Sequence, residues 1–173
     1  MNVQYLNPFI EAAAEVLALE VGATVTRGPA ALHRSPYTAR DVTVTLSLIG
    51  RVEGMVLYGL STDTALQLVS QMMGDTIGEM DELAQSGIAE LGNVMTGRAS
   101  IKLAQAGYDC NISTPTVILG SATRISTLDF QRLALPLRTQ YGDIEIHLAL
   151  REGAPASMAA TAVAGAEVGA TTR

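Results

Sequence analysis

Two stretches of the sequence alternate apolar and polar residues with a period of two, and this alternation constrains the fold most strongly. In residues 42–48, valine and leucine alternate with threonine and serine, and in residues 144–151 isoleucine and leucine alternate with other residues. A period of two places alternate side chains on opposite faces of a strand, so both stretches predict half-buried strands. Residues 52–60, after the turn residues Gly50 and Arg51, predict the returning strand of a hairpin.

Other segments follow the helical period of 3.6 residues. The predicted helices cover residues 8–21, 63–73 and 81–106. Asn7 is expected to cap the first of them and Gly22 to end it, since these residue types favour those positions. Helices of this length, separated by strands, point to a mixed fold.

The remaining segments complete the predicted order of elements. Residues 116–126 predict a strand, and residues 132–138 predict another, which Pro136 confines to the edge of a sheet because proline has no N–H to donate. Residues 23–40 are expected to be irregular. The resulting order, α-β-β-α-α-β-β-β, predicts an α+β fold: an antiparallel β-sheet with helices packed on one face.

Composition limits the domain organisation. Residues 1–152 are long enough for one domain with a substantial core. From residue 153 onward, 11 of 21 residues are alanine or glycine, and such a segment has few large apolar side chains to bury. We therefore predict a single domain over residues 1–152 and a mobile tail over residues 153–173.

The charged residues and the cysteine exclude several classes of function. A net charge of -6 without a lysine or arginine cluster argues against nucleic-acid binding. No apolar run reaches the ~20 residues that span a bilayer, and the N-terminus lacks the pattern of a signal peptide, so we expect a cytoplasmic protein. Cys110 is the single cysteine, and with two histidines it cannot build a usual metal site. A buried thiol is the simpler expectation for Cys110 than a nucleophile.

One face of the predicted helix 81–106 carries small and polar residues only. At 100° per residue, the residues within about 60° of one another on this face are Ser86, Glu90, Asn93 and Gly97, and Ser100 extends the same stripe. The opposite face is apolar and consists of Ala84, Ile88, Leu91, Met95 and Ala99. A helix face exposed only to water normally carries several long charged side chains. The small residues instead suggest a surface on which a partner docks.

Glu90 and Asn93 lie three residues apart, so their side chains are neighbours on the helix. A carboxylate can pair with a cation, and an amide can orient a water molecule through its donors and its acceptor. Hydrolysis of an activated phosphoryl group needs little more than such positioning. A solvated or capping role for the two residues is the competing interpretation, because the same spacing occurs on many helices.

The sequence resembles the CheC/CheX/FliY chemotaxis phosphatases. The family pattern is Asp/Ser-x3-Glu-x2-Asn followed about 22 residues later by proline, and this chain matches it with Ser86, Glu90, Asn93 and Pro115. The opening Asn7-Pro8-Phe9 and the single copy of the motif make the chain CheX-like, since the CheC and FliY branches usually carry two copies. The resemblance covers roughly residues 3–151, and the tail is not part of it.

The resemblance implies dephosphorylation of a phospho-aspartate on a CheY-type response regulator, in chemotaxis or a related two-component pathway. Asn93 would orient the attacking water, and Glu90 would pair with the regulator's active-site lysine. Ser86, Gly97 and Ser100 would let the receiver domain approach, and Pro115 would shape the chain beside the helix. The chain would need no cofactor of its own, since the regulator would supply Mg²⁺.

Alternatives to this function stay open at the level of sequence. A non-catalytic receiver-binding module of the flagellar-switch type is the first alternative. A weaker one is a sensor or scaffold in which the acidic linker 74–82 and the tail bind another partner. Family members often form homodimers through sheet edges. Pro136 would obstruct backbone pairing on its strand, so the edge used by such a dimer is open.

Overall fold

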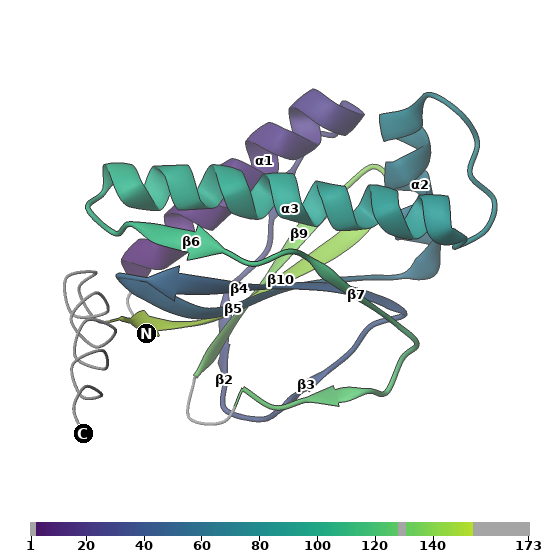
Figure 1. Cartoon of the computed structure of the whole chain (residues 1–173). Helices are drawn as coiled ribbons and strands as arrows, with labels where there is room; N and C mark the ends of the chain where they lie inside the picture. Colours follow the sequence, from purple (N-terminus) through teal and green to yellow (C-terminus); the bar gives the residue numbers. More distant parts are fainter. Residues whose placement is uncertain (1–2, 128–130, 154–173) are drawn as a thin grey trace, which may run out of the picture.

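The computed structural model describes residues 3–127 and 131–153 (Figure 1). Helices lie on one face of a large sheet, and two extended segments of the chain run across the other face. Residues 154–173, which make up nearly all of the predicted tail, lie outside the described residues. Within the described part, no helix is long and apolar enough to cross a membrane.

Antiparallel pairing builds the large sheet, which contains eight strands among the described residues. Its order is β1–β9–β10–β5–β4–β6, with β2 also paired to β9 and β7 also paired to β4. The strands are β1 (Thr26–Arg27), β2 (Ala31–His33), β4 (Val42–Gly50), β5 (Val52–Leu60), β6 (Cys110–Ile112), β7 (Thr116–Leu119), β9 (Arg132–Thr139) and β10 (Gly142–Glu152). The predicted α+β fold, an antiparallel sheet with helices on one face, is confirmed.

The helices are α1 (Leu6–Val21), which follows the short 3₁₀ turn η1 (Val3–Tyr5), α2 (Thr62–Met73) and α3 (Glu82–Gln105). Gly22 ends α1 with a φ of 64°, in the left-handed region that glycine adopts readily, as predicted. Asn7, in contrast, lies inside α1, and Tyr5 occupies the capping position. The prediction for Asn7 was wrong because η1 continues directly into α1, which leaves no extended capping residue between them.

Short strands account for most of the other differences from the expected elements. The segment 23–40, expected to be irregular, contains β1, β2 and β3 (Tyr37–Thr38), and the segment 116–126 contains β7 and β8 (Arg124–Ile125) in place of one continuous strand. The strand β6 was not predicted. Strands of two to four residues are too short to show a period of two, so pattern analysis does not detect them.

Pro136 does not place β9 at a sheet edge, which corrects the prediction. On the side opposite β10, β9 pairs with β1 at Leu137 and Arg138 and with β2 from Arg132 to Ala134. Opposite Pro136 these two strands are interrupted, and the N–H of Gly28 donates to the Pro136 carbonyl at 2.8 Å. The missing donor is thus accommodated by a break in the neighbouring chain, and Pro136 does not lie on a free edge where a second copy would pair.

The main core lies between the helices and the sheet. Its strand residues are the apolar members of the predicted alternation, such as Val44 and Leu46 of β4 and Ile146 and Leu148 of β10, all about 1% exposed. The intervening residues face the other side of the sheet, where the small sheet β3–β8 and its flanking loops cover part of the surface (Figure 1). The two faces of the sheet therefore have different surroundings.

Candidate functional site

The helix α3 carries the predicted site and lies close against its neighbours. A Cβ atom added at Gly92 would lie 2.8 Å from Cγ1 of Val44 on β4, and one added at Gly87 would lie 2.8 Å from Cγ1 of Val69 on α2. Real Cβ contacts are longer, so the absence of a side chain at these positions lets the helix backbone approach strand and helix. The apolar face predicted for this helix is buried in the core.

A buried pair of hydroxyl groups joins the middle of α3 to the sheet. Thr96 Oγ1 donates its single hydrogen to the Gly92 carbonyl at 2.8 Å. In the bond of 2.9 Å between Thr96 Oγ1 and the Tyr58 hydroxyl of β5, Tyr58 is therefore the donor. Burial raises the pKa of Tyr58, partly offset by its bond to Thr96. The bond lies one helical turn from Asn93 and holds that part of the helix in one position.

Polar contacts also hold the two ends of α3. Asp81 caps the first turn, accepting from the N–H of Ala84 at 2.8 Å. Near the last turn, the Lys102 ammonium donates to Glu15 at 2.7 Å and to Glu11 at 3.3 Å, both on α1. These hydrogen bonds, that to Glu15 foremost, raise the pKa of Lys102, which stays charged at neutral pH. The helix thus presents its outer face from a rigid base.

Glu90 and Asn93 lie side by side on this outer face, as the spacing predicted. Glu90 is exposed and Asn93 is half-buried. The Asn93 amide donates from Nδ2 to Glu90 Oε2 at 3.4 Å, a long hydrogen bond that a closer partner could replace. The amide oxygen of Asn93 and its second N–H remain available to a water molecule. The pair can thus hold a water and a cation next to each other.

The other residues of the stripe present little side-chain bulk. Ser86 is exposed, one turn before Glu90. The Ser100 hydroxyl donates back to the Gly97 carbonyl at 2.8 Å, so it is turned toward the helix backbone. At Gly97 an added Cβ would meet only Ile112 Cδ1, at an ordinary 3.8 Å. Internal packing therefore does not require the glycine at position 97, unlike those at 87 and 92.

Exposed apolar side chains flank the stripe. Leu83 and Ile101 are 55% and 56% exposed. They are separated by 18 residues, which is five helical turns, so they lie on the same side of α3 about 27 Å apart. Large exposed aliphatic groups around a polar pair are typical of surfaces that bind another protein.

Pro115 lies in the segment that runs alongside α3. Both β6 and β7 pair with β4 and contact α3, and Pro115 comes directly before β7 (Figure 1). At the junction, Ser113 exchanges hydrogen bonds with the backbone of Ser47, each at 2.9 Å. Proline fits this interruption in the pairing because it offers no N–H. The shaping role of Pro115 stays a prediction.

Of the remaining candidate groups, Cys110 lies near one end of this face, where it lines a pocket of about 350 Å³ together with Ser100 and Ile101 of α3. Cys110 is a free, half-buried thiol, and burial raises its pKa, which disfavours the reactive thiolate. Among the described residues, no group of three or more histidine, cysteine or acidic side chains could hold a metal ion. The 720 Å³ pocket on the other face of the sheet is lined by neither Glu90 nor Asn93. Glu90 and Asn93 thus lie on an exposed helix face, which suits a macromolecular partner.

Sequence analysis missed the residues that seat α3. Gly92 stands inside the predicted motif, but its role depends on its distance to Val44, which no local pattern contains. The Tyr58–Thr96 bond did leave a signal: Tyr58 is a core-facing position of a strand, and a buried tyrosine hydroxyl needs a partner. The identity of the partner, 38 residues away, required the structure.

Comparison with known proteins gives consistent matches. A family model described as "Chemotaxis phosphatase CheX" matches residues 42–138. The CheY-P phosphatase CheX of Thermotoga maritima is 30% identical over 155 residues, covering 88% of this chain and 99% of that protein. Among solved structures, a CheC-like superfamily protein from Shewanella sp. PV-4 has a TM-score of 0.79 at 25% identity, covering 87% of this chain and 99% of that one. A CheX–CheY–BeF₃–Mg²⁺ complex from Borrelia burgdorferi matches with a TM-score of 0.73 at 26% identity, covering 87% of this chain and all of that one.

Proposed function

The chain belongs to the CheX family of CheC-like chemotaxis phosphatases, and from that membership we propose that it hydrolyses the aspartyl phosphate of a CheY-type receiver domain. The relative from Thermotoga maritima, which this chain covers almost completely, is a CheY-P phosphatase. The complex from Borrelia burgdorferi contains a CheX bound to a CheY. Both support a phosphorylated receiver as the partner and substrate, and the proposal places the protein in the cytoplasm.

One observation supports the roles proposed for Glu90 and Asn93: the two side chains lie together on the exposed face of a helix that is packed tightly against the sheet. In the proposed step, the oxygen of a water molecule forms a bond to phosphorus while the bond from phosphorus to the aspartyl carboxylate oxygen breaks. The products are the free carboxylate, inorganic phosphate and a proton. A carboxylate is a good leaving group, so the enzyme contributes mainly position.

Asn93 is proposed to orient the attacking water. Its amide oxygen accepts a hydrogen bond from the water, which directs a lone pair of the water toward phosphorus. An amide does not remove a proton at neutral pH, and the reaction of an acyl phosphate does not need a strong base. The same division of labour is known for glutamine side chains that position water in other phosphoryl transfers.

Glu90 is proposed to anchor the receiver through its active-site lysine. In the free protein its only described hydrogen-bond partner is the amide of Asn93, at 3.4 Å. A lysine ammonium at normal ion-pair distance would displace this long bond and release the amide for water. Docking and activation of the amide would then occur together.

We assign the Mg²⁺ of this reaction to the receiver and no cofactor to this chain. The complex from Borrelia burgdorferi contains Mg²⁺ and BeF₃. On the stripe, Glu90 and Asn93 offer one carboxylate and one amide, too few to hold Mg²⁺ without a second molecule. Ser86, Gly97 and Ser100 are proposed to leave room for the receiver, with Leu83 and Ile101 at the border of the contact.

The direct test uses phosphorylated receivers from the same genome. Each is phosphorylated with a small-molecule donor, separated from it, and followed for loss of phosphate with and without this protein. A catalytic amount of protein should accelerate the loss from at least one receiver. Binding of a phosphorylated receiver without acceleration would instead show a non-catalytic module of the flagellar-switch type and contradict the proposal.

A further inference from the structure

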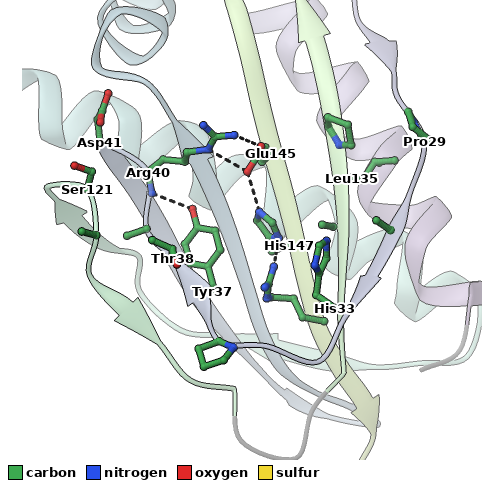
Figure 2. Close-up of a pocket in the computed structure, with 17 residues that line it drawn as sticks. Pro29, His33, Tyr37, Thr38, Arg40, Asp41, Ser121, Leu135, Glu145 and His147 are labelled. Carbon is green, nitrogen blue, oxygen red and sulfur yellow. Dashed lines mark hydrogen bonds and ion pairs between the residues drawn. The ribbon is translucent and has the colours of Figure 1, made fainter.

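The face of the sheet opposite the helices contains a pocket of about 720 Å³ (Figure 2). Its walls come from separate parts of the chain: the segment around β2, the segment 36–41 with β3, the loop after β7, and the strands β9 and β10. The volume is in the range of sites that bind small molecules. The sheet separates this pocket from α3 and its stripe, so it belongs to a different surface of the molecule.

Small residues hollow the floor of the pocket. Ala31, Ala134 and His147 lie opposite one another on β2, β9 and β10, so their side chains share one row across this face. The two alanines leave space that larger side chains would fill. The neighbouring row carries His33 and Arg132, which are also paired in register. Both of these residues line the pocket.

Arg132 is the unusual group at this site. It is only 4% exposed. Its Nη1 donates to His147 Nδ1 at 2.6 Å, its Nη2 donates to the Ser35 carbonyl at 3.2 Å, and its guanidinium lies 5.3 Å from the centre of the Tyr37 ring. In the described part of the chain, its Nε is buried with no hydrogen-bond partner. A guanidinium offers five N–H groups, and two of them have acceptors here.

The partners of Arg132 do not neutralise its charge. A guanidinium only donates, so His147 Nδ1 accepts, and the imidazole proton lies on Nε2, which donates to Glu145 at 3.3 Å. Burial lowers the pKa of His147, which favours this neutral form. Glu145 is itself held by Arg40. The carboxylate is thus paired elsewhere, and Arg132 contacts only neutral groups among the described residues.

The charged groups are also separated along the pocket. Figure 2 shows Arg40, Asp41 and Glu145 at one end and His33 at the other, with His147 between them. Asp41 is exposed and accepts from the N–H of Thr62. Among the described residues, the end that contains Arg132 and His33 therefore has the buried guanidinium and no carboxylate in contact with it. A buried cation in this state is costly unless a counter-charge reaches it.

We propose that this pocket binds a small organic anion, whose carboxylate or phosphate oxygen accepts hydrogen bonds from the unused N–H groups of Arg132. His33 borders the same end and offers a further donor. The rest of the ligand lies over Ala31 and Ala134, against the ring of Pro29. Carboxylate and phosphate share the chemistry that matches a planar guanidinium, and the test distinguishes between them.

The test measures the thermal unfolding midpoint and the dissociation constant of the full chain with two groups of probes. Inorganic phosphate and phenyl phosphate form one arm, acetate and benzoate form the other, and sodium chloride at equal ionic strength is the reference. A ligand specific to the folded state raises the midpoint with saturation. At least one arm should show saturable binding that chloride does not reproduce, and its identity assigns the anionic group.

Matched variants locate the binding. Arg132→Met and Ala134→Leu, which fills the floor but keeps every charge, should each weaken binding about tenfold or more. Arg138→Met removes the same charge from the same strand outside the pocket and should leave binding unchanged. Arg132 is buried, so if its variant does not fold, Ala134→Leu alone decides the location. Absence of saturable binding in both arms, or equal binding by Ala134→Leu and the unaltered chain, would overturn the proposal.

Discussion

Glu90 and Asn93 have different proposed tasks, although one weak hydrogen bond joins them. The carboxylate provides charge for docking, and the amide provides geometry for hydrolysis. The 3.4 Å separation between Asn93 Nδ2 and Glu90 Oε2 means that neither side chain loses much when a partner separates them. Substitution of each residue should therefore change a different measurable quantity.

Glu90→Ala is expected to weaken binding of the receiver. The lost ion pair with a lysine becomes partly desolvated in the complex, so the dissociation constant should rise about tenfold or more, equivalent to about 1.4 kcal/mol or more. Titration of a fluorescently labelled receiver in its BeF₃-bound form measures this directly. Glu20→Ala removes an exposed carboxylate from α1 and is the control. Equal affinity of the Glu90 and Glu20 variants would exclude the anchoring role.

The sequence could predict these two residues because helical geometry alone makes neighbours of positions three apart. It could not predict the state of Ser100, whose hydroxyl bonds to the Gly97 carbonyl in place of facing outward. A serine in a helix can adopt either arrangement, and local sequence does not distinguish them. Arg132 and His147 were missed for another reason: on their strands they look like ordinary polar members of an alternating pattern.

At the scale of the element, the position of α3 depends on glycine residues that let its backbone lie close to the neighbouring strand and helix. Gly92 and Gly97 both lie inside the helix, so replacement by alanine brings the same gain in helix propensity at each. Only at Gly92 would the new Cβ lie within 2.8 Å of Val44 Cγ1. The difference between the two variants therefore isolates the packing contribution.

Gly92→Ala should be less stable than Gly97→Ala by about 1–3 kcal/mol, the usual cost of overpacking. Urea unfolding followed by circular dichroism gives both free energies of unfolding under identical conditions. If the two variants had the same stability, the short distance at Gly92 would not constrain the position of α3.

Gly97→Ala also tests whether the stripe must lack bulky side chains for the receiver domain to bind. The added methyl group has room inside the protein, so the fold should be retained or slightly stabilised by about 0.5–1 kcal/mol. If a receiver domain approaches closely at this position, the rate of receiver dephosphorylation at low enzyme concentration should fall. A variant that is as active as the unaltered chain would remove Gly97 from the docking surface.

The long elements were predictable from the sequence because each contains several periods of its pattern. The hairpin of β4 and β5, the strand β10 and the helices α2 and α3 are of this kind. The strand β9 shows the limit: Pro136 correctly indicated a missing hydrogen bond, but the sheet resolved it by a break between β1 and β2. Which of the two solutions a fold uses depends on a segment more than 100 residues away.

At the scale of the whole molecule, the sheet separates two surfaces with different chemistry. One carries α3 and its docking stripe, and the other carries the pocket with its network of Arg40, Glu145, His147 and Arg132. The fold class was accessible from the sequence, but this network was not, since it joins a loop to strands about 100 residues further along. The network also makes the free energy of unfolding depend on pH, because it lowers the pKa of Glu145 in the folded protein.

Glu145→Gln is expected to reduce the acid sensitivity of the fold. Hydrogen bonds from His147 and Arg40 lower the pKa of Glu145 to about 2, so the folded state favours the ionised form. This contribution is present above the ordinary carboxyl pKa and is lost as the pH falls through about 2. The free energy of unfolding, measured from pH 7 to pH 2, should be lower for the variant at neutral pH and should fall less steeply below about pH 4.5. Parallel curves would show that Glu145 does not contribute.

The most direct test of the central claim is the rate of receiver dephosphorylation with Asn93→Ala, measured together with the affinity of the same variant for the BeF₃-bound receiver. The account predicts that affinity stays within about threefold, while acceleration of phosphate loss falls about a hundredfold or more, toward the receiver's own rate. Gln67→Ala, which removes an exposed amide from α2, should keep full activity. Full acceleration by Asn93→Ala would contradict the assignment of this amide as the group that positions the attacking water.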